Sequence, residues 1–126
     1  MREIKVRAWY KPYKQMCNVS MLQFDYDGTI CAAVIIEKPF NDQRLAKIDD
    51  LIIEQDTGLK DRNGTKINEG DVLVDDAGEP IEYWTVKFSE GGFVGECAGV
   101  VEPLFELTQL EVAGNIHENP ELVEEK

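Results

Sequence analysis

The stretch TGLKDRNGTKINEGDVL, residues 57–73, decides the fold because it combines dense turn chemistry with the entry into an apolar strand. Glycine reaches positive φ without steric cost, and Asn63-Gly64 supplies the two positive-φ positions that a tight hairpin corner requires. Gly70 then leads into a strand at residues 71–74. The stretch therefore predicts short antiparallel strands joined by tight turns.

On the amino-terminal side, residues 2–10 alternate with the period of two that is typical of a strand. One of its two faces is formed by Ile4, Val6, Ala8 and Tyr10. A turn at residues 11–14 follows, because the proline there cannot donate to a strand ladder. Residues 15–24 and 30–36 are extended segments that flank Asp27-Gly28. This dipeptide is well suited to a two-residue corner, so we expect a β-hairpin.

The pattern of residues 39–50 is ambiguous. Asn41 could cap a short helix, whose apolar face would be formed by Leu45, Ile48 and Ile52. Whether residues 41–50 form this helix is left open. Residues 51–55 have the pattern of a strand.

Further short strands are indicated at residues 81–88, 93–97 and 111–116, separated by polar loops such as Ser89-Glu90-Gly91-Gly92. Asn119-Pro120-Glu121 has the features of the cap and first turn of a short helix. Short strands at this spacing favour a small barrel over a parallel sheet. The expected fold class is mainly β, with antiparallel strands and few short helices.

The composition is that of a folded, cytoplasmic domain. The chain has 126 residues, 43% of them hydrophobic and 30% charged, which suffices for one domain with its own core. Its charged start lacks the apolar run of a signal peptide, and no segment approaches the length of a membrane span. The three cysteines, Cys17, Cys31 and Cys97, show no pairing pattern. We expect them to be small buried apolar residues rather than parts of disulfides or of a zinc site.

The net charge of −12 should hinder approach to nucleic acid and to anionic lipid. The first fourteen residues are the exception, with five basic side chains against one acidic side chain. Aromatic residues are interleaved with the basic ones at Trp9, Tyr10, Lys11 and Tyr13, a composition that could stack on single-stranded nucleic acid. A nucleic-acid-binding small barrel is therefore the alternative function, although the charge of the remaining chain disfavours it.

A more remote alternative is a magnesium-dependent phosphatase of the haloacid-dehalogenase type. Asp25-Tyr26-Asp27-Gly28-Thr29 matches the spelling in which Asp25 is the nucleophile and Asp27 the acid/base partner. Asp71 and Asp75 lie in a GDxxxD pattern that would hold the metal ion. The phosphate-stabilising lysine would be Lys60 or Lys66.

The spacing of these motifs disfavours the phosphatase. Its two motifs should end parallel strands, and each parallel crossover takes about 30 residues including a helix. Only residues 30–69 separate them, and the strand before Gly70 is too polar for a buried parallel strand. We therefore expect Asp25 and Asp27 to form a hairpin corner.

Two other catalytic or metal-binding patterns are incomplete. Asp61 and Asn63 suggest a calcium loop, but Gly64 comes too early and the closing glutamate is missing. His117 is the single histidine, so a Cys-His nucleophile would have to recruit Cys97 or another thiol across the fold. We assign no catalytic, cofactor-binding or metal-binding residue.

Three blocks of the sequence together resemble the YopX-like proteins of bacteriophages and prophages. These blocks are MREIKVRAW at residues 1–9, TGLKDRNGTKINEGDVL at residues 57–73 and EVAGNIHENPEL at residues 111–122. The resemblance implies a phage or prophage origin and a β-rich fold with an SH3-like small barrel in the carboxy-terminal half. It implies no activity. Tyr10 replaces a common Asp, and Asp56 replaces a common aromatic residue.

The matched blocks have a structural rationale that requires no ligand. Gly58, Gly64 and Gly70 suit positive-φ positions, and Asp61 and Asp71 can accept backbone hydrogen bonds at turns. Asn115 could do the same before the closing helix. A motif made of turn residues specifies a fold more readily than a reaction.

The expected protein is a single YopX-like domain, residues 1–126, with a possible β lobe at 1–55 and a small barrel at 56–126. Its expected function is that of a non-catalytic accessory protein in the host bacterial cytoplasm, without cofactors. It would bind a host or phage protein, or assemble with itself. Self-assembly is plausible because strand edges and aromatic residues such as Trp9 and Trp84 invite packing, although both tryptophans could equally be core residues.

Overall fold

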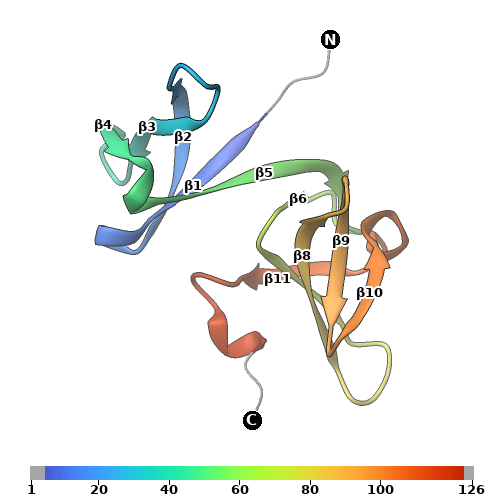
Figure 1. The fold of residues 1–126 in the computed structure, drawn as a ribbon. Helices are drawn as coiled ribbons and strands as arrows, with labels where there is room; N and C mark the ends of the chain where they lie inside the picture. Colours follow the sequence, from blue (N-terminus) through green and yellow to red (C-terminus); the bar gives the residue numbers. More distant parts are fainter. Residues whose placement is uncertain (1–4, 124–126) are drawn as a thin grey trace. The chain divides into compact units, whose positions relative to one another are not determined.

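A computed structural model describes residues 5–123 of the chain (Figure 1). The chain divides into two compact units, Met1–Gln55 and Asp56–Lys126. The possible lobes inferred from the sequence have the same bounds. Each unit has its own buried cluster, so each is described by itself.

The first unit is an antiparallel sheet with the strand order β4-β3-β2-β1-β5. Two single-turn 3₁₀ helices, η1 (Lys11–Tyr13) and η2 (Ile48–Asp50), interrupt the chain between strands. The strands are β1 (Val6–Tyr10), β2 (Gln15–Phe24), β3 (Ile30–Glu37), β4 (Asp42–Lys47) and the start of β5 (Leu51–Lys60).

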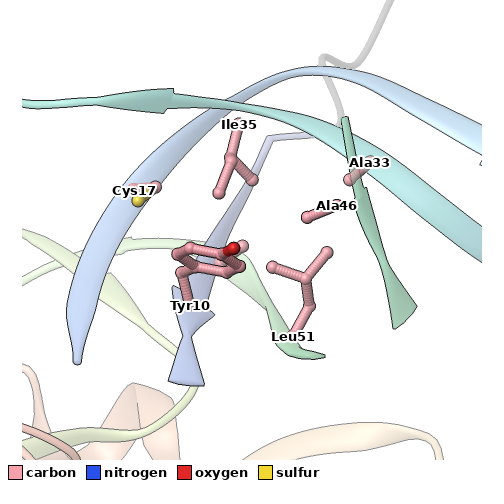
Figure 2. Packing of buried hydrophobic residues seen from close by; sticks show 7 residues of the cluster. Tyr10, Cys17, Ala33, Ile35, Ala46 and Leu51 are labelled. Atoms are coloured by element: carbon pink, nitrogen blue, oxygen red, sulfur yellow. The ribbon is translucent and has the colours of Figure 1, made fainter. Parts of the chain in front are cut away.

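The core of the first unit lies on one face of this sheet. Ala8 and Tyr10 are buried, as the alternation of the first strand predicts, whereas Ile4 lies outside the described residues. Figure 2 shows the Tyr10 ring surrounded by small and aliphatic side chains from the other strands. The buried cluster consists of Ala8, Tyr10, Cys17, Ala33, Ile35, Ala46 and Leu51. Small residues dominate it, which lets the strands wrap closely around one aromatic ring.

Residues 41–50, for which a helix was left open, do not form it. This segment forms β4 and η2 instead, and β4 pairs along its whole length with β3. Asn41 has a φ of 56°, the left-handed conformation of a turn residue rather than of a helix cap. Pairing with the apolar β3 overrides the local helical pattern and buries Ala46 opposite Ala33.

The second unit begins in the last residues of β5, which pair with β6 (Lys66–Asn68). A five-stranded antiparallel sheet of order β10-β9-β8-β7-β11 follows. Its strands are β7 (Asp71–Asp75), β8 (Glu82–Ser89), β9 (Gly92–Cys97), β10 (Val100–Pro103) and β11 (Glu111–Asn115). The mainly β, antiparallel fold is thus confirmed. Neither sheet closes into a barrel, so the SH3-like barrel is not confirmed.

The core of the second unit is built from larger side chains than that of the first, most of them aliphatic. It contains Ile67, Leu73, Trp84, Val86, Leu104, Leu107 and Leu110. Leu104 and Leu107 come from η3 (Leu104–Leu107), which the sequence analysis did not predict, and β10 was also missed. Gly95 on β9 makes this packing possible, because a Cβ at that position would collide with the Leu107 side chain.

Two-residue turns connect the strands β8, β9 and β10 of this sheet. Glu90-Gly91 joins β8 to β9, and Ala98-Gly99 joins β9 to β10. All four residues have positive φ, between 48° and 85°, which is the type I′ geometry that suits the twist of a hairpin. The turn predicted at residues 89–92 is therefore confirmed.

Truncation of Ile35 to alanine tests the core of the first unit. The side chain is fully buried, so Ile35→Ala should lower the free energy of unfolding by about 2–5 kcal/mol. Leu45→Ala on the neighbouring strand β4 is the control, because Leu45 is 62% exposed and should cost little. Urea unfolding followed by circular dichroism measures both, and equal losses would contradict the assignment of this core.

Candidate functional site

The phosphatase-like spelling at residues 25–29 forms the turn between β2 and β3. Asp25 and Thr29 close it, with the Asp25 amide donating to the Thr29 carbonyl oxygen at 2.9 Å and the Gly28 amide donating to the Asp25 carbonyl oxygen at 3.1 Å. The Asp25 carboxylate accepts from the amides of Asp27 and Thr29, at 3.3 and 3.2 Å. Asp27 accepts from the Thr29 amide at 3.0 Å. Both carboxylates accept hydrogen bonds from backbone amides, and the predicted hairpin turn at Asp25 and Asp27 is confirmed.

The same turn occurs a second time, between β5 and β6. Here the Asp61 amide donates to the Thr65 carbonyl oxygen at 2.9 Å, and the Gly64 amide donates to the Asp61 carbonyl oxygen at 3.0 Å. The Asp61 Oδ1 accepts from the amides of Asn63 and Thr65, at 2.8 and 2.9 Å. DYDGT and DRNGT thus share a structure as well as a pattern, Asp-x-(Asp/Asn)-Gly-Thr. Aligning these two stretches would have revealed the repeat from the sequence.

The geometry of the two turns differs from the two-residue corner that we expected. Only Gly28 and Gly64 have positive φ, at 87° and 80°, whereas Asp27 and Asn63 do not. A bond from the fourth residue to the first, followed by a glycine in the left-handed region, is a type I turn with a G1 bulge. The loop is therefore three residues long. The aspartate at the start of the loop stabilises this geometry, because its carboxylate accepts hydrogen bonds from backbone amides of the turn. A second residue with positive φ is therefore not required.

Asp61 differs from Asp25 in its burial and in one further contact. Asp61 is 7% exposed, and its Oδ2 accepts from the amide of Val112 at 2.9 Å, 51 residues along the chain. Burial raises the pKa of the Asp61 carboxyl, but the amides of Val112, Thr65 and Asn63 outweigh burial and lower it below its usual value. The carboxylate thereby ties the β5–β6 turn to β11.

The Arg62 side chain adds a second link between this turn and β11. Its guanidinium forms an ion pair with Glu111, with an Nε to Oε2 distance of 3.1 Å. The Arg62 amide also donates to the carbonyl oxygen of Leu110 at 3.2 Å. The DRNG turn is therefore anchored by backbone and side chain together.

The carboxy-terminal block GNIHENPEL, residues 114–122, contains a third turn that is held by side chains. Asn115 is buried, and its side-chain oxygen accepts from the amides of His117 and Glu118, at 3.0 and 2.9 Å. The Asn119 side chain accepts from the Asn115 amide at 3.2 Å. The expectation that Asn115 accepts backbone hydrogen bonds is confirmed. The predicted capping of η4 (Pro120–Leu122) by the Asn119 side chain is not observed. That side chain accepts a hydrogen bond from Asn115 instead.

Gly70 connects this block to the centre of the unit. Its amide donates to the Val86 carbonyl oxygen, and its own carbonyl oxygen accepts from the Ile116 amide, both at 2.9 Å. The Asp71 carboxylate accepts from the Asn68 amide at 2.8 Å and is buried. Gly58, Gly64 and Gly70 all have positive φ, between 80° and 82°, as predicted. The central and carboxy-terminal blocks therefore meet through backbone hydrogen bonds.

The phosphatase arrangement is not formed. Asp25 and Asp27 lie on an exposed turn of the first unit, whereas Asp71 is buried in the second, and the strand pairs around these residues are antiparallel. Lys60 and Lys66, offered as phosphate-binding lysines, face each other across the β5–β6 ladder. Among residues 5–123, no group of three or more His, Cys, Asp or Glu side chains could hold a metal ion. Asp61 and Asp75 therefore belong to no such group.

Cys97 has an environment opposite to that of a catalytic thiol. Its Sγ donates to the Glu82 carboxylate at 3.8 Å, and burial together with this negative charge raises the pKa of the thiol. A nucleophilic cysteine requires a lowered pKa. Of the three cysteines, Cys17 alone is buried as expected, and Cys31 and Cys97 are half-buried.

Comparison with known proteins decides the family. A family model described as YopX protein matches residues 5–124, nearly the whole chain. The chain belongs to the YopX family. The crystal structure of protein EF1440 from Enterococcus faecalis is similar to this YopX chain, with a TM-score of 0.72 and 28% sequence identity. The similarity covers 98% of this chain and 100% of EF1440. No functionally curated protein matches.

The basic and aromatic residues of this YopX chain's first unit are engaged with one another. Arg7 pairs with Glu54 at 3.1 Å, and the Lys11 amine donates to the Asp49 carbonyl oxygen at 3.1 Å. The Arg44 guanidinium, paired with Glu37, lies 5.1 Å from the centre of the Tyr13 ring and 5.7 Å from that of Tyr10. These contacts neutralise part of the surface that could bind nucleic acid.

The charge is divided unequally between the two units. The first contains eight basic and eight acidic residues, and the second contains five basic and seventeen acidic residues. The second unit therefore carries the whole net charge of −12. Two open grooves lie in this acidic unit, of about 610 and 580 Å³. No helix among residues 5–123 is long and apolar enough to cross a membrane.

The two Asp-x-(Asp/Asn)-Gly-Thr turns offer a matched pair of substitutions. Asp61→Ala should lower the free energy of unfolding by about 3 kcal/mol, because it removes all three hydrogen bonds that the buried carboxylate accepts from backbone amides. Asp25→Ala removes the equivalent bonds at an exposed turn, where water replaces them, so its cost should be clearly smaller. Urea denaturation of both variants measures the difference, and equal costs would contradict the anchoring role of Asp61.

The effect of Asp61 should also depend on pH. Because its pKa is lower in the folded protein, its stabilisation is complete above the unfolded value of about 3.9 and is lost as the pH falls through the folded value. Asp61→Asn places an amide donor among three backbone donors and lacks this titration. The stability difference between wild type and Asp61→Asn should therefore shrink below pH ~4.

Gly114→Ala tests the carboxy-terminal turn. The new Cβ would collide with the Asn119 side chain, which is fixed by its bond to the Asn115 amide, so we expect a loss of about 1–3 kcal/mol. Gly78→Ala is the control, because a Cβ there meets nothing within 4 Å and the φ is not positive. Thermal unfolding compares the two, and a neutral Gly114→Ala would show that this turn adds little.

Proposed function

We propose that this protein is a non-catalytic accessory protein of phage or prophage origin, and that it acts by binding a basic surface of a host or phage protein through its second unit. The division of charge carries the proposal. The first unit is neutral, whereas the second has seventeen acidic and five basic residues. The negative electrostatic potential is therefore concentrated around the second unit. Such a field steers a basic partner and increases its rate of association.

The use of the acidic residues supports a binding role over a catalytic one. Two carboxylates of the central family block, Asp61 and Asp71, are buried and accept backbone amides. Many other carboxylates of the second unit, among them Asp76, Glu79 and Glu90, are exposed. Solvated carboxylates of this kind contribute to long-range attraction and specificity rather than to chemistry.

A nucleic-acid-binding function has less support. Its best candidate surface is the basic strand β1 with its neighbouring aromatic rings, and Arg7 and Arg44 there pair with Glu54 and Glu37. The acidic second unit would repel a phosphate backbone. We keep this function as the alternative, together with self-assembly of the chain, and we place the protein in the host cytoplasm. The SH3-like barrel also stays a prediction, supported by the short antiparallel strands of the second unit.

Zero-length carbodiimide cross-linking tests the proposal, because it joins carboxylates to lysine amines only where they touch. The full chain is incubated with lysate of a host that carries the prophage, at low and at high salt, and cross-linked peptides are identified by mass spectrometry. We expect partner lysines joined to carboxylates of residues 56–126, with yields that fall at high salt because screening weakens exposed pairs.

Two outcomes would contradict this function. One is the absence of any cross-linked partner at low salt. The other is a pattern in which the partner's carboxylates are joined to lysines of residues 1–55. Binding of single-stranded DNA or RNA in fluorescence anisotropy at low salt would instead favour the alternative.

A further inference from the structure

One of the two grooves of the second unit is lined mainly by apolar side chains. It has a volume of about 580 Å³ and lies between the β8–β9 turn, β10 and the start of η3. Phe105 and Val101, which both border this groove, are 67% and 53% exposed. The other apolar residues are Leu59, Phe93, Val94, Pro103 and Leu104. Exposed apolar surface of this kind marks an interaction site.

The exposure of Phe105 is fixed by its neighbours. Leu104 and Leu107 are 1% and 6% exposed and point into the core of the unit. Residues three apart lie on the same face of a 3₁₀ helix, so burying this pair turns Phe105 outward. Gly95 leaves the room that Leu107 occupies over β9. Core packing therefore holds the groove open. Little conformational entropy should then be lost from this part of the backbone when a ligand binds.

The charged side chains of the groove are all acidic. Glu90 lies on the β8–β9 turn and Glu102 on β10, and Glu106 follows Phe105 in sequence. Within residues 5–123 none of these three glutamates has an ion-pair partner. A segment that fills the groove would therefore bring its own positive charge, in agreement with the charge of the whole unit.

Glu90 occupies a backbone conformation that disfavours it. Its φ is 50°, and it is the first residue of the type I′ turn Glu90-Gly91. Asparagine and glycine are preferred there, because other side chains meet the backbone in the left-handed region. The tight turn thus fixes the backbone of Glu90 at the rim of the apolar groove.

The edge of the sheet itself offers little to an added strand. β10 is the edge strand, but it is four residues long and ends at Pro103, which has no amide to donate. Contact through side chains in the groove is therefore more favourable than continuous β-pairing along this edge.

We propose that this groove binds a short basic segment of a partner protein, placing an apolar side chain against Val101 and Phe105 and a lysine or arginine beside Glu90 and Glu102. The inference rests on the proposed function and assigns that function to one surface. The occupant is a segment of another protein rather than a second copy, since the second unit carries a charge of −12 and would repel its own kind.

Labelled peptides test the recognition in fluorescence anisotropy with the full chain. The first peptide alternates lysine with leucine, and the second has the same charge but carries serine in place of leucine. We expect the lysine–leucine peptide to bind at least about tenfold more tightly, because only it fills the groove. Equal affinities would overturn the proposal, since they would mean that charge alone is recognised.

Two matched variants locate the binding surface. Phe105→Ser should weaken the lysine–leucine peptide by at least about tenfold without unfolding the protein, because the side chain is mostly exposed. Phe40→Ser is the control, since Phe40 is 82% exposed in the first unit and should leave binding unchanged. The same loss in both variants, or in neither, would overturn the assignment.

Glu90→Asn separates the charge from the fold. Asparagine suits the left-handed position before Gly91, so the variant should melt at a higher temperature than wild type. It should nevertheless bind the lysine–leucine peptide severalfold more weakly and with less dependence on salt. A variant that is more stable and binds equally well would show that Glu90 has no part in recognition and would overturn the charge pairing.

Light scattering and cross-linking distinguish the remaining outcomes. A dimer that Phe105→Ser dissociates would mean that a second copy fills the groove, which contradicts the inference. If Phe105→Ser still yields the cross-linked partner, the proposed function stands and the groove assignment falls. If wild type yields no partner at all, the proposed function falls irrespective of the peptide result.

Discussion

The second unit depends on one carboxylate, that of Asp61, which accepts three backbone amides while almost fully buried. Two of these amides close the β5–β6 turn, and the third belongs to Val112 at the start of β11. A buried amide without a partner is costly, so the turn and β11 are stable only together. Gly70 makes a similar link, since it bonds to Val86 on one side and to Ile116 on the other. Backbone hydrogen bonds thus hold the ends of this unit to its middle.

Much of this framework could be predicted from the sequence, because turn residues act locally. The strands around Asp27-Gly28 and Asn63-Gly64, the positive φ of Gly70 and the acceptor roles of Asp61, Asp71 and Asn115 follow from the preferences of single residues. The segment at residues 42–47 did not follow, because its local pattern fits a helix and only pairing with β3 makes it a strand. The same holds for η3, whose place depends on the space above Gly95.

The candidate binding surface could not be predicted for a related reason. An apolar residue in a sequence is by default expected to be buried, and Leu104, Phe105 and Leu107 are equally apolar. Which of them faces solvent is decided by the three-residue period of η3 and by the packing of the two leucines. The division of charge, in contrast, is visible in the sequence once the boundary between the units is known.

The repeated turn shows why a short motif is a poor guide to function in this chain. DYDGT and DRNGT have the same backbone hydrogen bonds, yet every residue of the first is exposed, whereas the second begins with the buried Asp61. The two turns differ in the partners that distant residues supply. The Val112 amide donates to the outer oxygen of Asp61, whereas the outer oxygen of Asp25 has no such distant partner among the described residues. The buried carboxylates of the central family block, Asp61 and Asp71, accept hydrogen bonds from backbone amides. The partner recognition that we propose rests on side chains that the fold leaves unused, and in the second unit Phe105, Glu90 and Glu102 are such side chains.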